Sequence, residues 1–473
     1  MTMQTSLFAD AVTAENFLLD TDSYKYSHPQ QFPDGTEYVS AYIEPRRPDG
    51  EIDEVLFFGL QVELMKLAGR VVTQDMLDEA EPFIAAHGLT LYTEMFQHII
   101  DIHGGRLPVQ IDALPEGTRA PISIPQVRIV NTDPRCWALP GFLETRLLRA
   151  VWYPSTVATR SNYVVRKIRD RLLKTDGTDA GLAFKLHDFG ARGATSAESA
   201  ALGGAAHLVN SMGTDTIAGA ALARKVYGAD MAGFSIPATE HSTVTSFGPE
   251  GELAFMRRFL RDNPTGIIAC VSDSYDLMRA VRDYWGTELR EEVLAREGTL
   301  VVRPDSGDPL KIVPDVIEAL IEKFGHSLTQ TGYRLLPDQV RVIQGDGVDQ
   351  ISIVAIMDAM IDRGLAIGNI AFGMGGGLLQ KLDRDTFSYS MKTSAICVNG
   401  AWRDVYKDPV TAKGAKTSKK GRIGVMRTDS GKFVVRPQQN IPQGHDALET
   451  VFQDGKVTKR QSFAEIRAKV GLI

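Results

Sequence analysis

The stretch Ile370–Gly377 reads Ile-Ala-Phe-Gly-Met-Gly-Gly-Gly, a short apolar run followed by a glycine-rich end. An apolar run without polar alternation is typical of a strand that is buried on both faces of a parallel sheet. Four glycines among residues 373–377 then let the chain turn sharply and leave its backbone bare. The stretch therefore predicts a buried strand that ends in an exposed loop.

The same pattern recurs through the second half of the chain. From about residue 183, apolar runs alternate with helical patterns such as Asp315–Phe324 and Ile351–Arg363. The runs end in polar tips at residues 187–190, 213–216, 240–242, 272–274, 303–307, 344–347 and 373–377. About seven such units, without the reversal expected of an open sheet, favour an α/β barrel with its functional groups at the carboxyl ends of the strands.

The two ends of the chain have a different texture. The spacing predicts a strand at Tyr38–Ile43, a helix over Val55–Leu67 and short β pieces over Val109–Ile129. Near the C-terminus, Asp454-Gly455 predicts a hairpin turn, and Ser462-Phe463-Ala464-Glu465 is a capping box that opens a last helix. These segments indicate a small β layer outside the main core.

Composition narrows the class of protein. The chain has 473 residues, a net charge of −7 and 43% hydrophobic residues. Length predicts two or three domains, and the acidic balance disfavours a dedicated nucleic-acid binder. We find no secretory signal and no apolar run near the ~18 residues of a membrane helix, so we expect a cytoplasmic protein without a membrane partner. Cys136, Cys270 and Cys397 are far apart with no CxxC pair, which argues against disulfides and against a structural zinc site.

The glycine-rich tips are candidates for binding anions. Backbone N–H groups at Gly375 and Gly376 can approach a phosphate closely, and the helix expected after them adds its dipole. A tight turn is the competing interpretation, but four glycines in five residues favour phosphate. At Gly345-Asp346-Gly347, a carboxylate for ribose hydroxyls and a simple turn are equally good interpretations.

Charged residues occupy the other tips. Arg303 and Asp305 lie two residues apart and can face the same side, which suits a phosphate and its sugar. Asp215 and Asp273 each precede a helical run, so helix capping is the favoured interpretation of each residue taken singly. His241 lies beside a carboxylate, and six basic residues between Lys407 and Arg422 form either a solvated loop or the mouth of a site for a polyanion.

Eight motifs follow one another along the chain: Asp22-Ser23-Tyr24-Lys25, residues 185–190, 213–216, 240–243, 271–276, 303–307, 344–347 and 375–381. In this order, over about residues 16–468, they resemble those of the nicotinamide phosphoribosyltransferase family. The resemblance implies a type II phosphoribosyltransferase: an irregular α/β barrel beside a β-rich α+β domain built from both chain ends. The expected segments are 1–180 and 385–473 for the β-rich domain and 181–384 for the barrel.

The resemblance also implies an activity. Nicotinamide and phosphoribosyl diphosphate would give nicotinamide mononucleotide and diphosphate, with Mg²⁺ as cofactor, ATP as coupling substrate and a homodimer that shares its active sites. Tyr24 and Phe189 would stack the ring, Asp215 would accept the carboxamide N–H, and Arg303 would lie nearby. Arg192, His241 and Arg303 would face the diphosphate.

Further roles follow from the same resemblance. Asp305, Gly345 and Asp346 would hold the ribose, and the catalytic residues would be His241, Asp305 and Asp273. His241 would be the residue that ATP phosphorylates. The 5′-phosphate would contact the remaining residues: Gly375, Gly376, Arg384, Ser390 and Lys392. The direct metal ligands are not assigned.

Three alternatives remain open at this point. A nicotinate phosphoribosyltransferase would need a cation where Asp215 stands, because nicotinate carries a carboxylate. A non-catalytic binding protein on the same scaffold would not need the charged tips. An aldolase-type barrel would need a lysine at a strand tip, and only Lys185 comes near one.

Overall fold

The computed structural model describes residues 16–408 and 418–473. Lys413 and Lys416 of the basic stretch lie outside the described residues. Contacts divide the chain into two units, one of residues 1–156 and 384–461 and one of residues 157–383 and 462–473. The three-segment division drawn from the sequence stays a prediction. Among the described residues, no helix combines the length and the apolar character needed to cross a bilayer.

The second unit is built on a six-stranded parallel sheet in the order β7-β6-β13-β12-β9-β8. Its strands are β6 (Leu186–Asp188), β7 (Gly213–Thr214), β8 (Thr265–Val271), β9 (Glu297–Arg303), β12 (Val340–Gln344) and β13 (Ile370–Met374). The extended segment 234–238 pairs in parallel with both edges, through Phe234 opposite Gly213 and Ala238 opposite Ala269. The sheet is therefore curled into the irregular α/β barrel that the sequence predicted.

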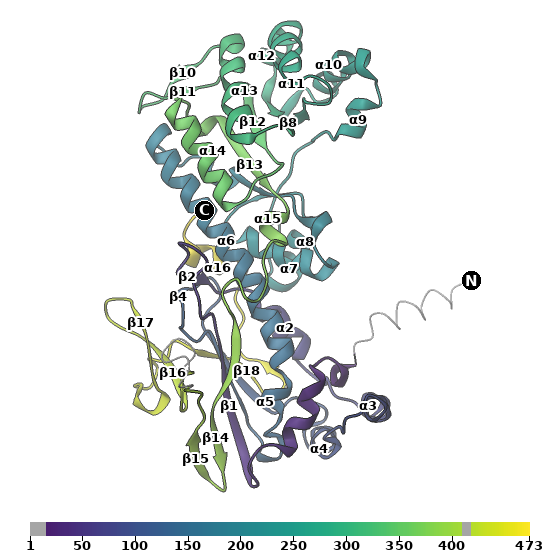
Figure 1. Cartoon of the computed structure of the whole chain (residues 1–473), viewed down its shortest axis with the longest axis vertical. Helices are drawn as coiled ribbons and strands as arrows, with labels where there is room; N and C mark the ends of the chain where they lie inside the picture. The colour runs from purple at the N-terminus through teal and green to yellow at the C-terminus, as the bar shows by residue number, and fades with distance from the viewer. Residues whose placement is uncertain (1–15, 409–417) are drawn as a thin grey trace, which may run out of the picture. The chain divides into compact units, whose positions relative to one another are not determined.

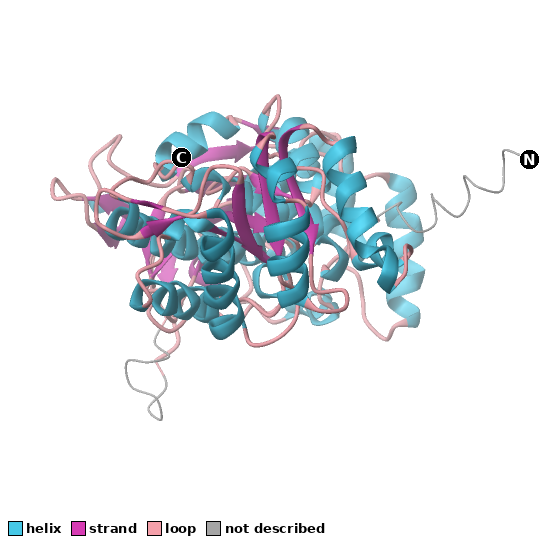
Figure 2. Ribbon diagram, turned by 90° about the horizontal axis from the view of Figure 1, so that it is seen from above, coloured by secondary structure: helices cyan, strands magenta, loops and turns pink. Residues whose placement is uncertain are grey.

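Helices flank the parallel strands (Figure 2). They are α6 (Glu144–Asp176), α7 (Ala197–Leu208), α8 (Ile217–Tyr227), α9 (His241–Thr245), α10 (Glu252–Asp262), α11 (Leu277–Arg279), η7 (Ala280–Glu288), α12 (Arg290–Leu294), α13 (Pro309–Phe324), α14 (Gln350–Asp362), α15 (Gly376–Leu379) and α16 (Phe463–Val470). Asp308 caps α13, and Asp349 and Ser352 form a capping box on α14. These two helices lie side by side in Figure 1. The short pair β10 (Ser327–Leu328) and β11 (Arg334–Leu335) lies between them in sequence.

The first unit contains a seven-stranded sheet in the order β15-β14-β1-β5-β3-β18-β19 (Figure 1). Its strands come from both chain ends: β1 (Thr36–Glu44), β3 (Val109–Ala113), β5 (Val127–Asn131), β14 (Ser390–Val398), β15 (Ala401–Asp404), β18 (Glu449–Gln453) and β19 (Lys456–Val457). All of its neighbouring pairs are antiparallel. This arrangement confirms a β-rich domain built from both ends of the chain.

Helices and smaller strand pairs complete this unit. They are η2 (Ser23–Gln30), α2 (Leu60–Leu67), α3 (Gln74–Ala86), α4 (Thr93–His103), η3 (Pro134–Cys136), α5 (Leu139–Phe142), β2 (Glu54–Leu56) with β4 (Arg119–Pro121), and β16 (Ile423–Arg427) with β17 (Phe433–Pro437). The helix expected over Val55–Leu67 is wrong at its start: Val55 and Leu56 are in β2, and the helix begins at Leu60 after a left-handed Gly59. The predicted hairpin turn at Asp454-Gly455 and the Ser462 capping box are confirmed.

Candidate functional site

The parallel strands bring the predicted tip residues to one edge of the barrel sheet. Because β6, β7, β8, β9, β12 and β13 run in the same direction, the residues after their last positions share that edge. The tip residues are Phe189 after β6, Asp215 after β7, Asp273 after β8, Asp305 after β9, Asp346 after β12 and Gly375 after β13. His241 follows the closing segment 234–238 as the first residue of α9.

His241 forms the centre of a charged cluster at this edge. Its Nε2 lies 2.9 Å from Asp273 Oδ1, and its Nδ1 lies 3.9 Å from Asp305 Oδ2. Arg303 Nη2 donates to the same Asp305 oxygen at 3.4 Å. The His241 side chain is 46% exposed, whereas that of Asp273 is 4% exposed. A solvent-facing imidazole is thus oriented by a buried carboxylate, with a second carboxylate on its other nitrogen.

Asp273 and Asp215 were open to interpretation as helix caps, and neither has that role. The cap of α11 is Asp276, which accepts from the Arg279 N–H at 3.0 Å. The residue before α8 is Thr216, which forms no side-chain cap. Asp215 is exposed and accepts a hydrogen bond from Ser235 Oγ at 2.6 Å. Its carboxylate retains further lone pairs for a donor on a ligand.

Glycines at two neighbouring tips make room for the ring of Phe189. A Cβ at Gly373 would lie 1.9 Å from Phe189 Cε2, and one at Gly345 would lie 3.0 Å from the same atom. The ring also packs against a buried cluster of Ala269, Val301 and Ile343 from three neighbouring strands. The strand ends therefore fix an aromatic face at the carboxyl edge of the barrel.

The glycine-rich tip at residues 373–377 differs from the prediction in the length of the helix that follows it. The helix after Gly375 is a single turn, Gly376–Leu379, so its dipole is smaller than that of a full helix. Gly377 serves packing, since a Cβ there would meet Met374 Cε and Val348 O at 3.0 Å. Gly375 and Gly376 keep the open backbone on which the phosphate interpretation depends. Arg192 in η5 (Ala191–Gly193) and Asp346 are exposed.

Four predicted site residues lie on the other unit. Tyr24 is in η2 and is 55% exposed. Arg384 donates Nη1 to the Tyr389 carbonyl at 2.9 Å. Ser390, at the start of β14, has a buried hydroxyl without a hydrogen-bond partner among the described residues. The pKa of Lys392 is lowered by burial and by the neighbouring Arg46 cation. Arg384, Ser390 and Lys392 offer cationic and hydrogen-bonding groups of the kind that bind a phosphate.

Sequence reasoning missed three charged residues, each of which lies near a predicted site residue of its own unit. Arg46 adds a cation near Lys392. Glu252 is buried with Oε1 unpartnered within the described chain, and burial, together with Asp276 and Asp273, raises its pKa. Asp188 is buried at the end of β6, and burial raises its pKa to about 6. Asp188 lies in a quoted motif, but its burial is a tertiary feature.

The donor chemistry near His241 suits a hard divalent cation. Asp273 and Asp305 present carboxylate oxygens on either side of the imidazole, and Glu252 adds a nearby carboxylate with an unpartnered oxygen within the described chain. Mg²⁺ prefers one or two carboxylates together with waters and substrate phosphates. The residues present therefore fit an ion that arrives with a phosphorylated substrate.

Comparisons with known proteins agree on one family. The model of the nicotinate phosphoribosyltransferase (NAPRTase) family matches residues 184–456. That of the nicotinamide phosphoribosyltransferase N-terminal domain matches residues 16–111. A nicotinamide phosphoribosyltransferase of Xanthomonas campestris pv. campestris (strain 8004) is 47% identical over 96% of this chain and 98% of its own. One of Acinetobacter baylyi (strain ATCC 33305 / BD413 / ADP1) is 32% identical over 95% and 96%.

Two solved structures share the fold. A nicotinate-nucleotide pyrophosphorylase from Pyrococcus furiosus aligns with a TM-score of 0.61 at 16% identity, covering 99% of this chain and 96% of its own. Human nicotinic acid phosphoribosyltransferase aligns with a TM-score of 0.57 at 18% identity, covering 96% and 93%. At such identities the likeness concerns the fold alone.

Proposed function

This chain belongs to the nicotinate phosphoribosyltransferase family, and from that premise we propose that it transfers the phosphoribosyl group of phosphoribosyl diphosphate to nicotinamide. The products are nicotinamide mononucleotide and diphosphate, a step of NAD salvage. The relatives named nicotinamide phosphoribosyltransferase, which align over almost the whole chain, support this choice within the family.

The observation that carries the choice of nicotinamide is the Asp215 carboxylate at the end of β7. It is exposed and anchored by Ser235, so it can accept an N–H of a carboxamide in a charge-assisted hydrogen bond. A nicotinate carboxylate at the same place would be repelled. Phe189, held against Gly373 and Gly345, supplies a flat surface for stacking the pyridine ring, and Arg303 lies at a neighbouring tip.

The chemistry needs no proton transfer. The pyridine nitrogen bonds to the anomeric carbon, the bond from that carbon to the diphosphate oxygen breaks, and the ring takes up the positive charge. Cationic character at the anomeric carbon and negative charge on the diphosphate both grow as that bond breaks. Catalysis is then positioning plus electrostatic stabilisation, which cations and carboxylates at fixed tips can provide.

We propose for the remaining groups the roles that the family resemblance implies. Arg192, His241 and Arg303 face the diphosphate, while Asp305, Gly345 and Asp346 hold the ribose. Gly375, Gly376, Arg384, Ser390 and Lys392 hold the 5′-phosphate. The buried Arg303 Nε and Ser390 Oγ, which lack partners among the described residues, support the two anion assignments, because buried polar atoms are ordinarily hydrogen-bonded.

Mg²⁺ fits the same cluster as a cofactor. Asp273 and Asp305 are the carboxylates we propose to hold it, and when bound it neutralises charge on the diphosphate. The chain's own residues do the orienting: Asp273 fixes the His241 ring, and Arg303 fixes Asp305.

ATP is the proposed coupling substrate, with His241 as the phosphorylated residue. Because Asp273 accepts from Nε2–H, Nδ1 of His241 carries the lone pair that can attack a phosphorus atom. The high exposure of the ring gives ATP access. Labelled ATP should leave acid-labile phosphate on the wild type and none on His241→Ala, and label that persists in the variant would refute this assignment.

We further propose a homodimer in which Tyr24 of one chain stacks with the ring held by Phe189 of the other. Exposed apolar side chains on the barrel unit, including Ile217 (80% exposed), Met231 and Phe234, support association with another chain. Inactive Tyr24→Ala and Asp215→Ala chains should regain activity when mixed dimers form. Mixed dimers without activity would contradict shared sites.

Two other interpretations are less well supported. Lys185 donates Nζ to the Gly368 and Ile370 carbonyls at 2.9 and 2.8 Å, away from the strand tips, so Schiff-base chemistry has no nucleophile there. A non-catalytic binding protein would not need the oriented His241. The three free, buried cysteines agree with the reducing cytoplasm that we propose as its location.

The decisive experiment gives the enzyme phosphoribosyl diphosphate with nicotinamide or with nicotinate and measures each mononucleotide. We expect a strong preference for nicotinamide, and we expect Asp215→Asn to reduce it by about tenfold or more, since a charge-assisted hydrogen bond contributes about 1.5–3 kcal/mol. Ser235→Ala is the matched control, because it removes only the anchor of Asp215. Equal use of both bases by the wild type would exclude the role of Asp215.

A further inference from the structure

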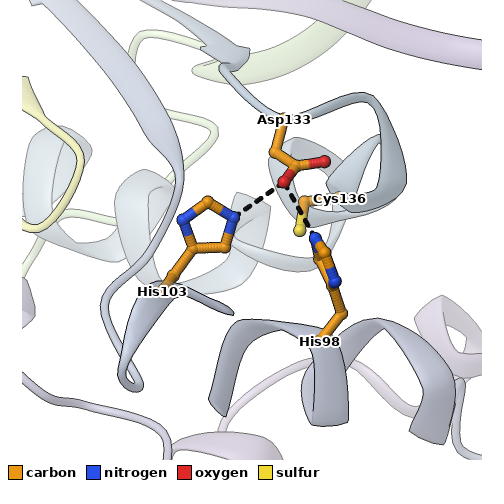
Figure 3. Close-up of side chains that lie close together, drawn as sticks. All are labelled: His98, His103, Asp133 and Cys136. Atoms are coloured by element: carbon orange, nitrogen blue, oxygen red, sulfur yellow. Dashed lines mark hydrogen bonds and ion pairs between the residues drawn. The ribbon is translucent and has the colours of Figure 1, made fainter. Parts of the chain in front are cut away.

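Four potential metal ligands meet in the β-rich unit (Figure 3). His98 and His103 come from α4, and Asp133 and Cys136 come from the turn around η3. His98 Nε2 and His103 Nε2 lie 2.8 and 2.7 Å from Asp133 Oδ2. One ligand atom from each of the four residues lies within 4.8 Å of the other three.

Local structure explains why these side chains converge. His98 and His103 lie five positions apart in the last turns of α4, which ends at the left-handed Gly104. Asp133 caps η3 through Oδ1, which accepts from the Arg135 N–H at 2.8 Å, and this leaves Oδ2 directed at the two histidines. Asn131 Nδ2 donates to the Asp133 carbonyl at 2.8 Å and supports the turn. Cys136 is the last residue of η3 and is fully buried.

The donor set matches one class of cation. Two imidazoles, one carboxylate oxygen and one thiolate are the ligands that Zn²⁺ takes in a closed tetrahedral site. At zinc bond lengths of about 2.0–2.3 Å, the ligand atoms would lie about 3.3–3.8 Å apart. The present separations bracket these values, so small side-chain rotations suffice. Hard cations such as Mg²⁺ and Ca²⁺ select oxygen ligands and do not suit this set.

Two further features agree with ion binding: a cleft that leads to the cluster, and a thiol without a hydrogen bond within the described residues. His103 lines a cleft of about 490 Å³ together with Arg106, Pro108, Asp454 and Lys456, which gives an ion a route to the cluster. The Cys136 thiol forms no hydrogen bond within the described part of the chain. Hydrogen bonding alone would account for the arrangement of His98, Asp133 and His103. It would not account for the Cys136 sulfur, which also lies within 4.8 Å of the other ligand atoms.

We propose that His98, His103, Asp133 and Cys136 bind one zinc ion, which ties the end of α4 to the turn between β5 and α5. On binding, each neutral histidine moves its proton from Nε2 to Nδ1, so that the Nε2 lone pair binds the ion in place of the hydrogen bond to Asp133, and the Cys136 thiol binds as the thiolate with its proton released to solvent. The carboxylate charge and the thiolate charge offset that of the ion. The site is independent of the barrel tips.

Sequence motifs that are defined by the spacing of metal ligands do not detect this site. The ligands form a His-x4-His and an Asp-x2-Cys pair that lie 30 residues apart, and no CxxC is present. The absence of that motif argued against structural zinc, but the motif describes zinc ribbons and fingers only. Here the second pair of ligands comes from a turn that the fold brings to the helix.

The test uses the full chain, stripped of metal by a chelator and titrated with Co²⁺ as a spectroscopic substitute for Zn²⁺. We expect one Co²⁺ per chain, with a thiolate-to-cobalt charge-transfer band in the near ultraviolet that Zn²⁺ abolishes. Cys136→Ser should lose the band and weaken zinc binding by more than about 100-fold, beyond the loss caused by removing an outer partner of a ligand. Cys397→Ser, which changes another buried free thiol of the same unit, should keep both.

Should Cys136→Ser not fold, as judged by circular dichroism, His103→Gln provides the second variant, since His103 is partly exposed. It should lower zinc affinity and leave the secondary structure intact. The proposal is overturned if wild type gives no charge-transfer band, or if the band persists in Cys136→Ser. It is also overturned if His103→Gln binds Zn²⁺ as tightly as wild type.

Discussion

At the amino ends of its strands, the barrel sheet holds its cations against backbone carbonyl groups, whereas at the carboxyl ends the cations and carboxylates face one another. Arg341 Nη1, near the start of β12, donates to the Leu336, Pro337 and Val340 carbonyls at 3.1, 2.6 and 2.8 Å, and its Nη2 donates to the exposed Asp338 carboxylate at 3.0 Å. Arg303, at the end of neighbouring β9, has one long contact of 3.4 Å to Asp305 and a buried Nε without a partner in the described chain.

The difference separates structural from functional charge. A guanidinium whose N–H groups already donate to carbonyls and to a neighbouring carboxylate has little left for a ligand, and removing it costs stability. A guanidinium held at one edge of a site with spare donors can bind an anion without reorganisation, as transition-state stabilisation requires. The same residue type thus serves opposite purposes at the two ends of one sheet.

The largest expected effect is that of Arg303→Gln. The change removes the cation proposed to face the diphosphate, and kcat/KM for phosphoribosyl diphosphate should fall by about 10²–10³, the usual result of deleting an electrostatic stabiliser. The melting temperature should hardly change. Arg303→Lys, which keeps the charge, should recover part of the loss in steady-state assays. A decrease below about tenfold, or about 1.4 kcal/mol, would remove Arg303 from the diphosphate site.

The next effect concerns Asp188, at the carboxyl end of β6. Burial raises its pKa to about 6 from an ordinary 3.8, against the hydrogen bond from the Gly190 N–H. The folded state therefore holds this proton where the unfolded chain has released it, so the stability from the protonated carboxyl is present at low pH and is lost as pH rises towards 6. At pH 8, the free energy of unfolding of Asp188→Asn should be about 2–3 kcal/mol higher than that of the wild type.

Urea titrations of both proteins at several pH values test this expectation. The difference between them should shrink as the pH falls from about 6 towards 4 and should level off at lower pH, where Asp188 is protonated in both states. A difference that is constant with pH would show that the Asp188 carboxyl is not the titrating group.

The barrel and its tip residues could be predicted from the sequence because both depend on local patterns. Apolar runs followed by glycine and charge mark the ends of parallel strands, and their common direction brings the tips together. The apolar run at residues 233–236, which precedes the tip at residues 240–242, covers the first part of the closing segment 234–238. The turn at Asp454-Gly455 and the cap at Ser462 were readable for the same reason, since a few adjacent residues determine each of them.

The rest depends on contacts between distant residues. Nothing near Gly373 in sequence shows that the Phe189 ring requires its missing side chain. The burial of Asp188 and Glu252 and the cation next to Lys392 are likewise results of packing. Val55 and Leu56 fitted a helical period, but pairing with β4 fixed them as a strand. Asp133 and Cys136 lie 30 or more residues after His103 in the sequence, and only the fold places them at α4.

Gly373→Ala should perturb the carboxyl edge by steric means alone. Its Cβ would lie 1.9 Å from Phe189 Cε2, so the ring must move, at a cost of about 1–3 kcal/mol. KM for nicotinamide should rise, and Gly345→Ala, with its 3.0 Å contact, should give a smaller rise. Phe189→Leu combined with Gly373→Ala should restore melting temperature without restoring KM. Equal KM values for both alanine variants and wild type would separate Phe189 from the ring site.

Arg341→Gln makes, near the amino ends of the barrel strands, the same arginine-to-glutamine change that Arg303→Gln makes at their carboxyl ends. One amide cannot replace a guanidinium that donates to three carbonyls, and the Arg341 side chain is only 22% exposed. The free energy of unfolding of Arg341→Gln should therefore be about 1 kcal/mol lower than that of the wild type. The barrel unit's melting temperature should fall by about 2–4 °C, while kcat and KM stay at wild-type values. Arg257→Gln, which breaks an exposed pair with Glu292, is the control and should shift stability by less than about 0.5 kcal/mol. If Arg341→Gln instead lowered kcat/KM as strongly as Arg303→Gln with an unchanged melting temperature, charge at the two ends of the sheet would not divide into structural and functional roles.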